Sequence, residues 1–435
     1  MARSGRHVRG GRLIFRSLKI RNYRLYAGGQ IIANIGTWVQ RIAQDWLVLQ
    51  LTHNNGAALG ITTGLQFLPM LLFGLWGSSF GDRFPKRRVL LVTQTLLSLL
   101  ALSLGTLTVL HVVQVWEVFA VAFLVGLVTV VDNPTRQTFV VEMVGRDSLA
   151  NAISLNSAQF NLARMAGPAI AGVLISLIGT GPLFFWNAFS YAGPIAGLLL
   201  MRATELRPAA AVPRVKGQIV QGFRYVRERP AILLPMIIIA FIATFGMNLQ
   251  ITTALFATKV FHQGASSYGL LTTAVALGSV GGALLSARAG RPTRHMLVAA
   301  ALAFGIVEFV AGLMPSYLTF LVLLIPCGLA SLVLITVANS TIQLNSSDQM
   351  RGRVMALYLL LSMGGAPIGA PFVGWIADTL GARWSLLAGG MISVVATIGA
   401  VVVFFLLRDR VLPSPMRAYH SVGDSLPRRQ RYSRS

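Results

Sequence analysis

Apolar residues occur along this chain in runs of about 20 residues or more, separated by short polar stretches. A helix needs about 20 apolar residues to cross a hydrocarbon core of about 30 Å. A soluble protein of 435 residues could not bury so many apolar runs in one core. The pattern therefore predicts an all-α membrane protein with twelve transmembrane helices. Their expected positions are 25–51, 57–81, 88–110, 115–135, 149–178, 182–201, 231–257, 266–287, 295–314, 317–342, 353–378 and 384–407.

The longest polar stretch between the spans, residues 202–230, divides the predicted helices into six before it and six after it. Val131-Asp-Asn-Pro-Thr-Arg-Gln137 at the end of span four matches Val337-Ala-Asn-Ser-Thr-Ile-Gln343 at the end of span ten, 206 positions later. This repeat predicts two pseudo-symmetric six-helix bundles with a substrate path at their interface, a recurrent transporter design. Residues 217–228 either form a short amphipathic helix on the membrane surface or are a plain tether. The predicted division is a basic tail at 1–24, a first bundle at 25–201, a linker at 202–230, a second bundle at 231–407 and a basic tail at 408–435.

The basic residues are distributed unevenly over the polar segments. The net charge is +24, although only 11% of the residues are charged and the mean hydropathy is +0.67. In the predicted topology, 33 of the 37 Lys and Arg residues lie on one side, two lie on the other, and Arg41 and Arg164 lie inside spans. Cytoplasmic loops carry such an excess, so we expect a protein of the plasma (inner) membrane with both termini in the cytoplasm. The basic tails are expected to lie near anionic lipids rather than to bind nucleic acid.

Sequence signals of other protein classes are missing. The first apolar run follows 24 polar, Arg-rich residues and is too long for the core of a secretory signal peptide. The single cysteine, Cys327, falls inside a span, and the sequence contains no HExxH, CxxC or Walker A pattern. We therefore expect no metal, no cofactor and no enzymatic activity. The two tails are too short and too polar to form the folded domain of a sensor.

Span one carries a stripe of polar side chains that is unusual for a membrane helix. They recur every three or four residues and so share one helical face: Gln30, Asn34, Trp38, Arg41 and Asp45, flanked by Thr37 and Gln44. Because such residues rarely face lipid, we expect this face to line a hydrated path for substrate and protons.

The charged residues of this path allow two interpretations each. Arg41 and Asp45 lie one turn apart. Either they form a static ion pair, or Asp45 exchanges a proton while Arg41 contacts the substrate. Arg164 in span five is either the partner of Asp45 across the path or a residue at the cytoplasmic helix end that reaches lipid headgroups.

Several motifs resemble those of the major facilitator superfamily. Gly77-Ser-Ser-Phe-Gly-Asp82-Arg83-Phe-Pro-Lys-Arg87-Arg88 is similar to the signature loop after span two, with Ser78 and Pro85 at two glycine positions. Ala163-Arg-Met-Ala-Gly167-Pro168-Ala-Ile-Ala-Gly172 resembles the antiporter motif of span five, with alanine at two glycine positions. Three further stretches resemble the transmembrane secretion effector branch, which includes siderophore and multidrug exporters: Thr37-Trp-Val-Gln40, Pro134-Thr-Arg136-Gln137 and Met350-Arg-Gly-Arg-Val354.

The resemblance implies a gate on the cytoplasmic side. The loop acid, here Asp82, is expected to cap the N-terminus of span eleven when this side is closed. Arg83 or Arg87 would then reach Asp132 or the neighbourhood of Arg136 at the end of span four. Alternatively, these loop charges serve only the topology. The deformable point formed by Gly167, Pro168 and Gly172 favours export.

Together these features predict a secondary transporter that works by alternating access. The leading hypothesis is a proton-coupled exporter (antiporter) of small amphipathic organic molecules, such as drugs or siderophore-like metabolites. Aromatic residues near the expected path favour hydrophobic substrates over sugars or anions. The alternatives are an importer of a small polar solute and a non-transporting membrane sensor or scaffold. Exporters of the superfamily commonly carry an Arg in span four where this chain has Ala122. If transport is coupled to protons, span one must therefore supply the charged residue for the coupling. We expect a monomer whose partners are a small-molecule substrate, protons and membrane lipids.

Overall fold

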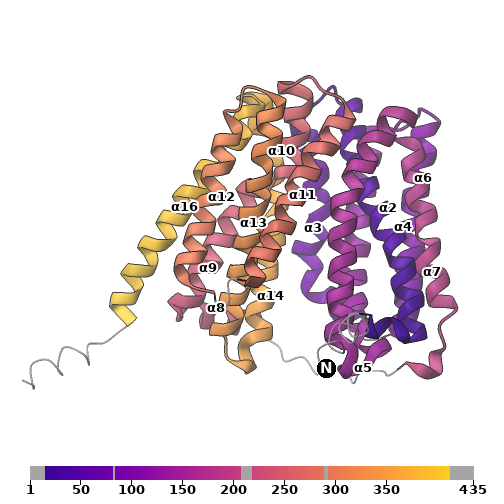
Figure 1. Cartoon of the computed structure of the whole chain (residues 1–435), viewed down its shortest axis with the longest axis horizontal. Coiled ribbons are helices and arrows are strands. Elements are labelled where there is room, and N and C mark those ends of the chain that lie inside the picture. Colours follow the sequence, from indigo (N-terminus) through magenta and orange to yellow (C-terminus); the bar gives the residue numbers. More distant parts are fainter. Residues whose placement is uncertain (1–14, 82–83, 207–217, 289–291, 412–435) are drawn as a thin grey trace, which may run out of the picture.

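The computed structural model describes residues 15–81, 84–206, 218–288 and 292–411, and every regular element in these ranges is a helix. The helices form two bundles that stand side by side (Figure 1). The first contains η1 (Arg16–Lys19), α2 (Arg21–Leu51), α3 (Gly56–Gly81), α4 (Lys86–Val109), α5 (Val115–Ile178), α6 (Gly181–Ser190) and α7 (Ala192–Leu199). The linker contributes η2 (Ala203–Glu205) and α8 (Gln218–Arg227). The second bundle contains α9 (Pro230–Phe241), η3 (Ile242–Gly246), α10 (Leu249–Leu255), η4 (Phe256–Val260), α11 (Ala265–Arg288), α12 (Arg294–Gly312), α13 (Tyr317–Asn345), α14 (Asp348–Gly364), α15 (Ala366–Thr379) and α16 (Ala382–Val411).

The helix lengths are consistent with twelve membrane crossings. Within the described residues, nine helical stretches are long and apolar enough to cross a membrane. One of them, α5, has 64 residues, but Gly145 (φ 67°, ψ 178°) is not helical and divides it into two helices. At 1.5 Å per residue, the parts 115–144 and 146–178 each exceed the roughly 30 Å of one crossing. The polar α2 and the pair α6 and α7 supply the remaining two. This break at Gly145 falls in the interruption that the sequence predicts between spans four and five, although the residues on both sides of it are helical.

Spans seven and eleven are bent or broken, and they pack on each other at these points. Span seven consists of α9 and α10 with a π-helical turn after each of them. Span eleven breaks between α14 and α15 at Gly365, just before Pro367, which has no backbone N–H to donate to the preceding turn. Gly365 and Gly369 allow the backbone of Thr244 to approach more closely than larger side chains would. Such π-turns are frequent at functional sites. The linker helix α8 forms as the amphipathic pattern predicts, and it packs on α14, where Arg353 donates to Gln221 at 2.5 Å.

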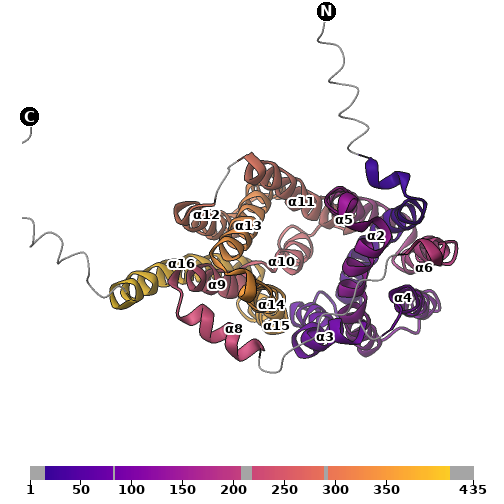
Figure 2. The same cartoon turned by 90° about the horizontal axis from the view of Figure 1, so that it is seen from below.

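The two bundles meet along two seams, α3 against α14 and α15, and α5 against α11, with α10 between them (Figure 2). We call the end of the molecule that carries α8 the linker side and the opposite end, with the turns at 52–55 and 261–264, the far side. Glycines bring the seams together near the far side. A side chain at Gly374 would collide with the backbone of Gly56, and one at Gly269 would collide with the backbone of Pro168. The far side is therefore closed in this structure.

Candidate functional site

A cavity of about 220 Å³ lies between the two bundles. The first bundle contributes two residues to its lining, Trp38 from α2 and Arg164 from α5. The second bundle contributes a mixture of apolar and hydroxyl-bearing residues: Met247, Leu249, Gln250, Thr253, Thr272, Val275, Ala276, Ser279, Ser331 and Ile335. Both halves of the chain are thus needed to form the walls.

The polar stripe of α2 is divided among three environments. Trp38 lines the cavity, and the guanidinium of Arg41 lies 5.2 Å from the Trp38 ring and 5.7 Å from the Phe67 ring. Gln30 instead turns toward α5, where it accepts a hydrogen bond from Arg136 at 2.8 Å. Asn34 is half-buried and Gln44 is buried. The stripe is therefore not one continuous path, and only its central part reaches the cavity.

Asp45 connects the two bundles. Its Oδ2 atom accepts hydrogen bonds from Gln250 Nε2 at 2.5 Å and from the Tyr268 hydroxyl at 2.8 Å. Trp46 stacks on Tyr268, with ring centroids 6.4 Å apart. Gln250 also lines the cavity, so Asp45 lies one hydrogen bond behind the cavity wall. Its two partners are neutral donors from α10 and α11, which the sequence did not indicate as partners.

The arginines near Asp45 do not neutralise it by direct contact. Among the described residues, Asp45 forms no ion pair with Arg41, although the two lie one turn apart, and none with Arg164. Arg164 points into the cavity near the middle of the second half of α5 rather than at a helix end. Neither the static pair with Arg41 nor the partnership with Arg164 is formed in this structure.

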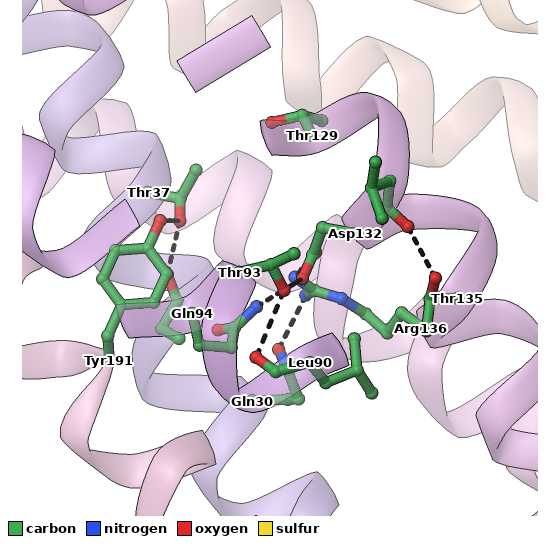
Figure 3. Close-up of polar contacts among 12 residues, drawn as sticks. Gln30, Thr37, Leu90, Thr93, Gln94, Thr129, Asp132, Thr135, Arg136 and Tyr191 are labelled. Carbon is green, nitrogen blue, oxygen red and sulfur yellow. Dashed lines mark hydrogen bonds and ion pairs between the residues drawn. The ribbon is translucent and has the colours of Figure 1, made fainter. Parts of the chain in front are cut away.

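A second polar cluster, shown in Figure 3, lies inside the first bundle. Asp132 accepts hydrogen bonds from Thr93 at 2.7 Å and from Gln94 at 2.8 Å, and it forms an ion pair with Arg136 one turn further along α5. Arg136 also donates to Gln30. All of these contacts join α2, α4 and α5. They hold the first bundle together, and Asp132 is buried in it.

The expected cytoplasmic gate is predicted for the state in which that side is closed, whereas in this structure the far side is closed. Arg87 does not reach Asp132; it donates to the carbonyl oxygens of Leu198 at 2.6 Å and Leu199 at 3.0 Å. The reason is that Arg136 already occupies the free oxygen of Asp132, while Arg87 meets the unsatisfied carbonyls at the end of α7. Asp82 and Arg83 lie outside the described residues.

The motif around Gly167 positions three helices. A side-chain atom added at Gly167 would lie 2.5 Å from Cβ of Trp38, so the glycine allows α5 to pack directly on α2 beside the cavity. Gly172 plays the same part toward α11, since an added atom would lie 2.8 Å from the carbonyl oxygen of Ala265. Pro168 lies between them and contacts Gly269 through its carbonyl. The motif thus joins the cavity to the α5–α11 seam.

The other seam is closed by Asp378 at the end of α15. Its carboxylate accepts from the backbone N–H groups of Gly56 at 2.8 Å and Ala57 at 2.7 Å, and from Lys259 at 2.6 Å. An acid of the second bundle therefore caps the N-terminus of α3 in the first. Gln250, inside an otherwise apolar span, was the signal in the sequence that could have pointed to the contact with Asp45.

Solved structures of other proteins share the fold of this chain. The fold resembles a bacterial homologue of the human lysosomal transporter Spinster in its inward-facing, unoccupied conformation, with TM-score 0.67, 18% identity, and coverage of 91% of this chain and 99% of that one. It also resembles a D-xylose–proton symporter, with TM-score 0.64, 14% identity, and coverage of 88% and 96%. The arrangement of two helical bundles around a central cavity is thus a fold that this chain shares with solved transporters.

Sequence comparison is more specific. The model of the transmembrane secretion effector family matches residues 15–413, and the chain belongs to this family. The chain is 24% identical to the staphyloferrin A transporter of Staphylococcus aureus, covering 89% of this chain and 97% of that one. It is 28% identical to the multidrug efflux pump Tap of Mycolicibacterium fortuitum (88% and 95%) and 22% identical to the enterobactin exporter EntS of Escherichia coli (86% and 90%). The chain is therefore a multi-pass membrane transporter related to efflux proteins.

Proposed function

We propose that this protein is a proton-coupled exporter (antiporter) of small amphipathic organic molecules, such as drugs or siderophore-like metabolites, and that it works by alternating access. The observation that carries the proposal is the position of Asp45. This acid of the first bundle is held by Tyr268 and by Gln250 of the second bundle, and Gln250 lines the cavity. Proton exchange at Asp45 would therefore act on the contact between the bundles.

The chemistry of the contact explains how a proton would act. Both donors bind the same oxygen, Oδ2, of Asp45. Hydrogen bonds to an ionised carboxylate are roughly twice as strong as those between neutral groups. A proton on Asp45 removes this charge and occupies one acceptor position, so it weakens both bonds across the far-side closure. Substrate that displaces Gln250 from the cavity wall would act on the same bonds.

Direction and orientation follow from other features. The linker side is proposed to be cytoplasmic, since it carries the loops rich in Arg and Lys, including the turn before α4 and the linker itself. With the far side closed, the cavity would then face the cytoplasm, from which an exporter loads. The names of the relatives Tap and EntS support export. A single chain forms the whole cavity, which supports a monomer.

The proposal is tested in proteoliposomes with an imposed pH gradient and a panel of fluorescent dyes and siderophores. We expect the wild type to accumulate substrate against its gradient. Asp45→Asn keeps the size and polarity of the side chain but cannot titrate, so it should lose gradient-driven accumulation and retain facilitated exchange. Glu228→Gln, at an exposed acid directly after α8, is the matched control and should behave as wild type. Full gradient-driven accumulation by Asp45→Asn would show that this carboxylate is structural.

A further inference from the structure

The charges around the central cavity do not balance. Among the described residues that line it, Arg164 is the only charged one, and no acceptor or carboxylate contacts its guanidinium. Arg41 adds a second guanidinium next to Trp38, where it stacks on aromatic rings rather than pairing with an acid. The acid nearest to the cavity, Asp45, is already held by Gln250 and Tyr268. The first-bundle wall therefore presents unpaired positive charge.

The position of Arg164 excludes a simple lipid contact. It lies 14 residues before the end of α5 at Ile178 and 19 after the kink at Gly145, which places it about 20 Å or more from either end of this helical segment. An arginine side chain cannot snorkel over that distance to the headgroups. An ionised group at this depth is costly unless water or an opposite charge compensates it. The cavity supplies the space for water or an anion.

The opposite wall has complementary hydrogen-bonding character. Each of its four hydroxyl groups donates its own hydrogen to a backbone carbonyl of the same helix: Thr253 to Leu249 at 2.6 Å, Thr272 to Tyr268 at 3.1 Å, Ser279 to Val275 at 2.9 Å and Ser331 to Gly328 at 2.9 Å. A hydroxyl whose hydrogen is used in this way still offers oxygen lone pairs. This wall therefore accepts hydrogen bonds from a ligand, while the Arg164 wall donates them.

We propose that the cavity binds amphipathic organic acids, with the carboxylate of the ligand at Arg164 and its hydroxyl or amide N–H groups at the Ser and Thr wall. The planar guanidinium matches a carboxylate in a two-pronged contact. The apolar body of the ligand would lie against Met247, Leu249 and Ile335. This inference rests on the proposal that the cavity is the substrate site, and it replaces the expectation that the path disfavours anions. An inside-negative membrane potential favours the outward movement of an anion, so the inference fits export.

The test is equilibrium binding to the purified full-length protein in detergent, measured by calorimetry with three probes of equal size. These are 6-hydroxy-2-naphthoate, its neutral primary amide and the corresponding methylammonium compound. We expect the acid to bind at least about tenfold more tightly than the amide, as for a hydrogen bond to a charged group, and the cation to bind most weakly. In Arg164→Gln the acid and the amide should bind alike. Arg164→Lys should keep a preference for the acid, and Arg224→Gln, at an exposed residue of α8, should leave all three affinities unchanged.

The outcomes separate this inference from the proposed function. A wild type that binds the amide or the cation as tightly as the acid overturns the inference, even if all variants fold poorly. So does an advantage of the acid that persists in Arg164→Gln. The binding measurement uses no proton gradient. If the protein prefers the acid but does not couple transport to protons, the inference about the ligand stands and the proposal of an antiporter is wrong. If the protein accumulates cationic dyes by proton exchange and does not bind the acid, the proposal of an antiporter stands and the inference about the ligand is wrong.

Discussion

At the scale of single residues, the buried charges of the first bundle and those at the interface between the bundles have different surroundings. Inside the first bundle they are paired locally, as in Asp132 with Arg136 and Lys86 with Glu142. At the interface they are not: Asp45 is held by neutral donors of the other bundle, and Arg164 has no partner among the described residues. Locally paired charges stay satisfied while the bundles move. Unpaired charges at the interface are available to protons or to substrate.

This difference predicts that the Asp132 cluster acts on stability. Asp132→Asn leaves the Arg136 guanidinium buried without its counter-charge, and breaking a buried pair from one side costs roughly 3–5 kcal/mol of folding stability. The double variant Asp132→Asn/Arg136→Gln removes both charges and should regain much of this loss. Thermal unfolding of the detergent-solubilised protein measures both. Equal midpoints for the single and double variants would mean that the pair is not the source of the stability.

The sequence could identify the charged residues of the site but not their partners. The stripe on α2 is visible because its spacing of three and four residues matches the helical period, and Asp45 and Arg164 are rare charges inside apolar spans. The partners of Asp45 lie 205 and 223 positions away. No local pattern determines which spans meet or how deeply each one lies.

At the scale of the helices, the seams depend on small residues. The α5–α11 seam closes where Gly172 and Gly269 bring two backbones together, and the α3–α15 seam does so at Gly56 and Gly374. Neither contact involves a long side chain that could move aside. The seams are therefore sensitive to one added methyl group, in the way that small-residue contacts between membrane helices generally are.

Gly269→Ala should prevent full closure of the far side. Its Cβ would collide with the carbonyl of Pro168, and overpacking costs roughly 1–3 kcal/mol, which shifts a two-state equilibrium by about 5- to 150-fold. We expect a cysteine introduced at Gln263 on the far side to become more reactive toward a membrane-impermeant thiol reagent and turnover to fall. Gly281→Ala in the same helix is the control, because its Cβ would meet only Leu329 at 3.7 Å. Unchanged reactivity in Gly269→Ala would contradict the role of this seam.

The number and positions of the spans were largely predictable, but the shapes of the helices were not. Hydropathy alone locates the crossings, because the membrane requires long apolar runs. It does not reveal that the polar segment 136–148 is helical on both sides of the break at Gly145, where Arg136 pairs with Asp132 and Glu142 pairs with Lys86. Nor does it reveal the π-turns on either side of α10. Thr244, in the first of these turns, packs against Gly365 and Gly369.

At the scale of the whole molecule, the distribution of basic residues predicts the orientation in the membrane. Reporter fusions after residue 435 and within 202–230 should report the cytoplasm, and fusions near His53 or His262 should report the outside. Both histidines lie in far-side turns with positive φ values of 53° and 52°. A C-terminus on the outside would contradict the orientation and, with it, the direction of loading.

The far-side closure consists of three separate contacts between the bundles. These are the hydrogen bonds to Asp45, the cap that Asp378 places on α3, and the glycine contacts of the two seams. All three lie on the same side of the cavity, and each joins one bundle to the other. Because the bundles are internally packed, loosening this side would swing them as bodies about the cavity. Opening here would then bring the linker-side ends together.

We therefore predict reciprocal changes of distance at the two ends. Spin labels at Asn54 and Gln263 report on the far side, and labels at the exposed Ala150 and Leu344 report on the linker side, in a Cys327→Ala background. Asp378→Asn weakens the acceptor at the α3 N-terminus and the ion pair with Lys259, so it should lengthen the far-side distance and shorten the linker-side one. Asp147→Asn, at an exposed acid away from the seams, is the control. If both distances lengthened together, or only one changed, the bundles would not move as rigid bodies and alternating access by rocking would be wrong for this protein.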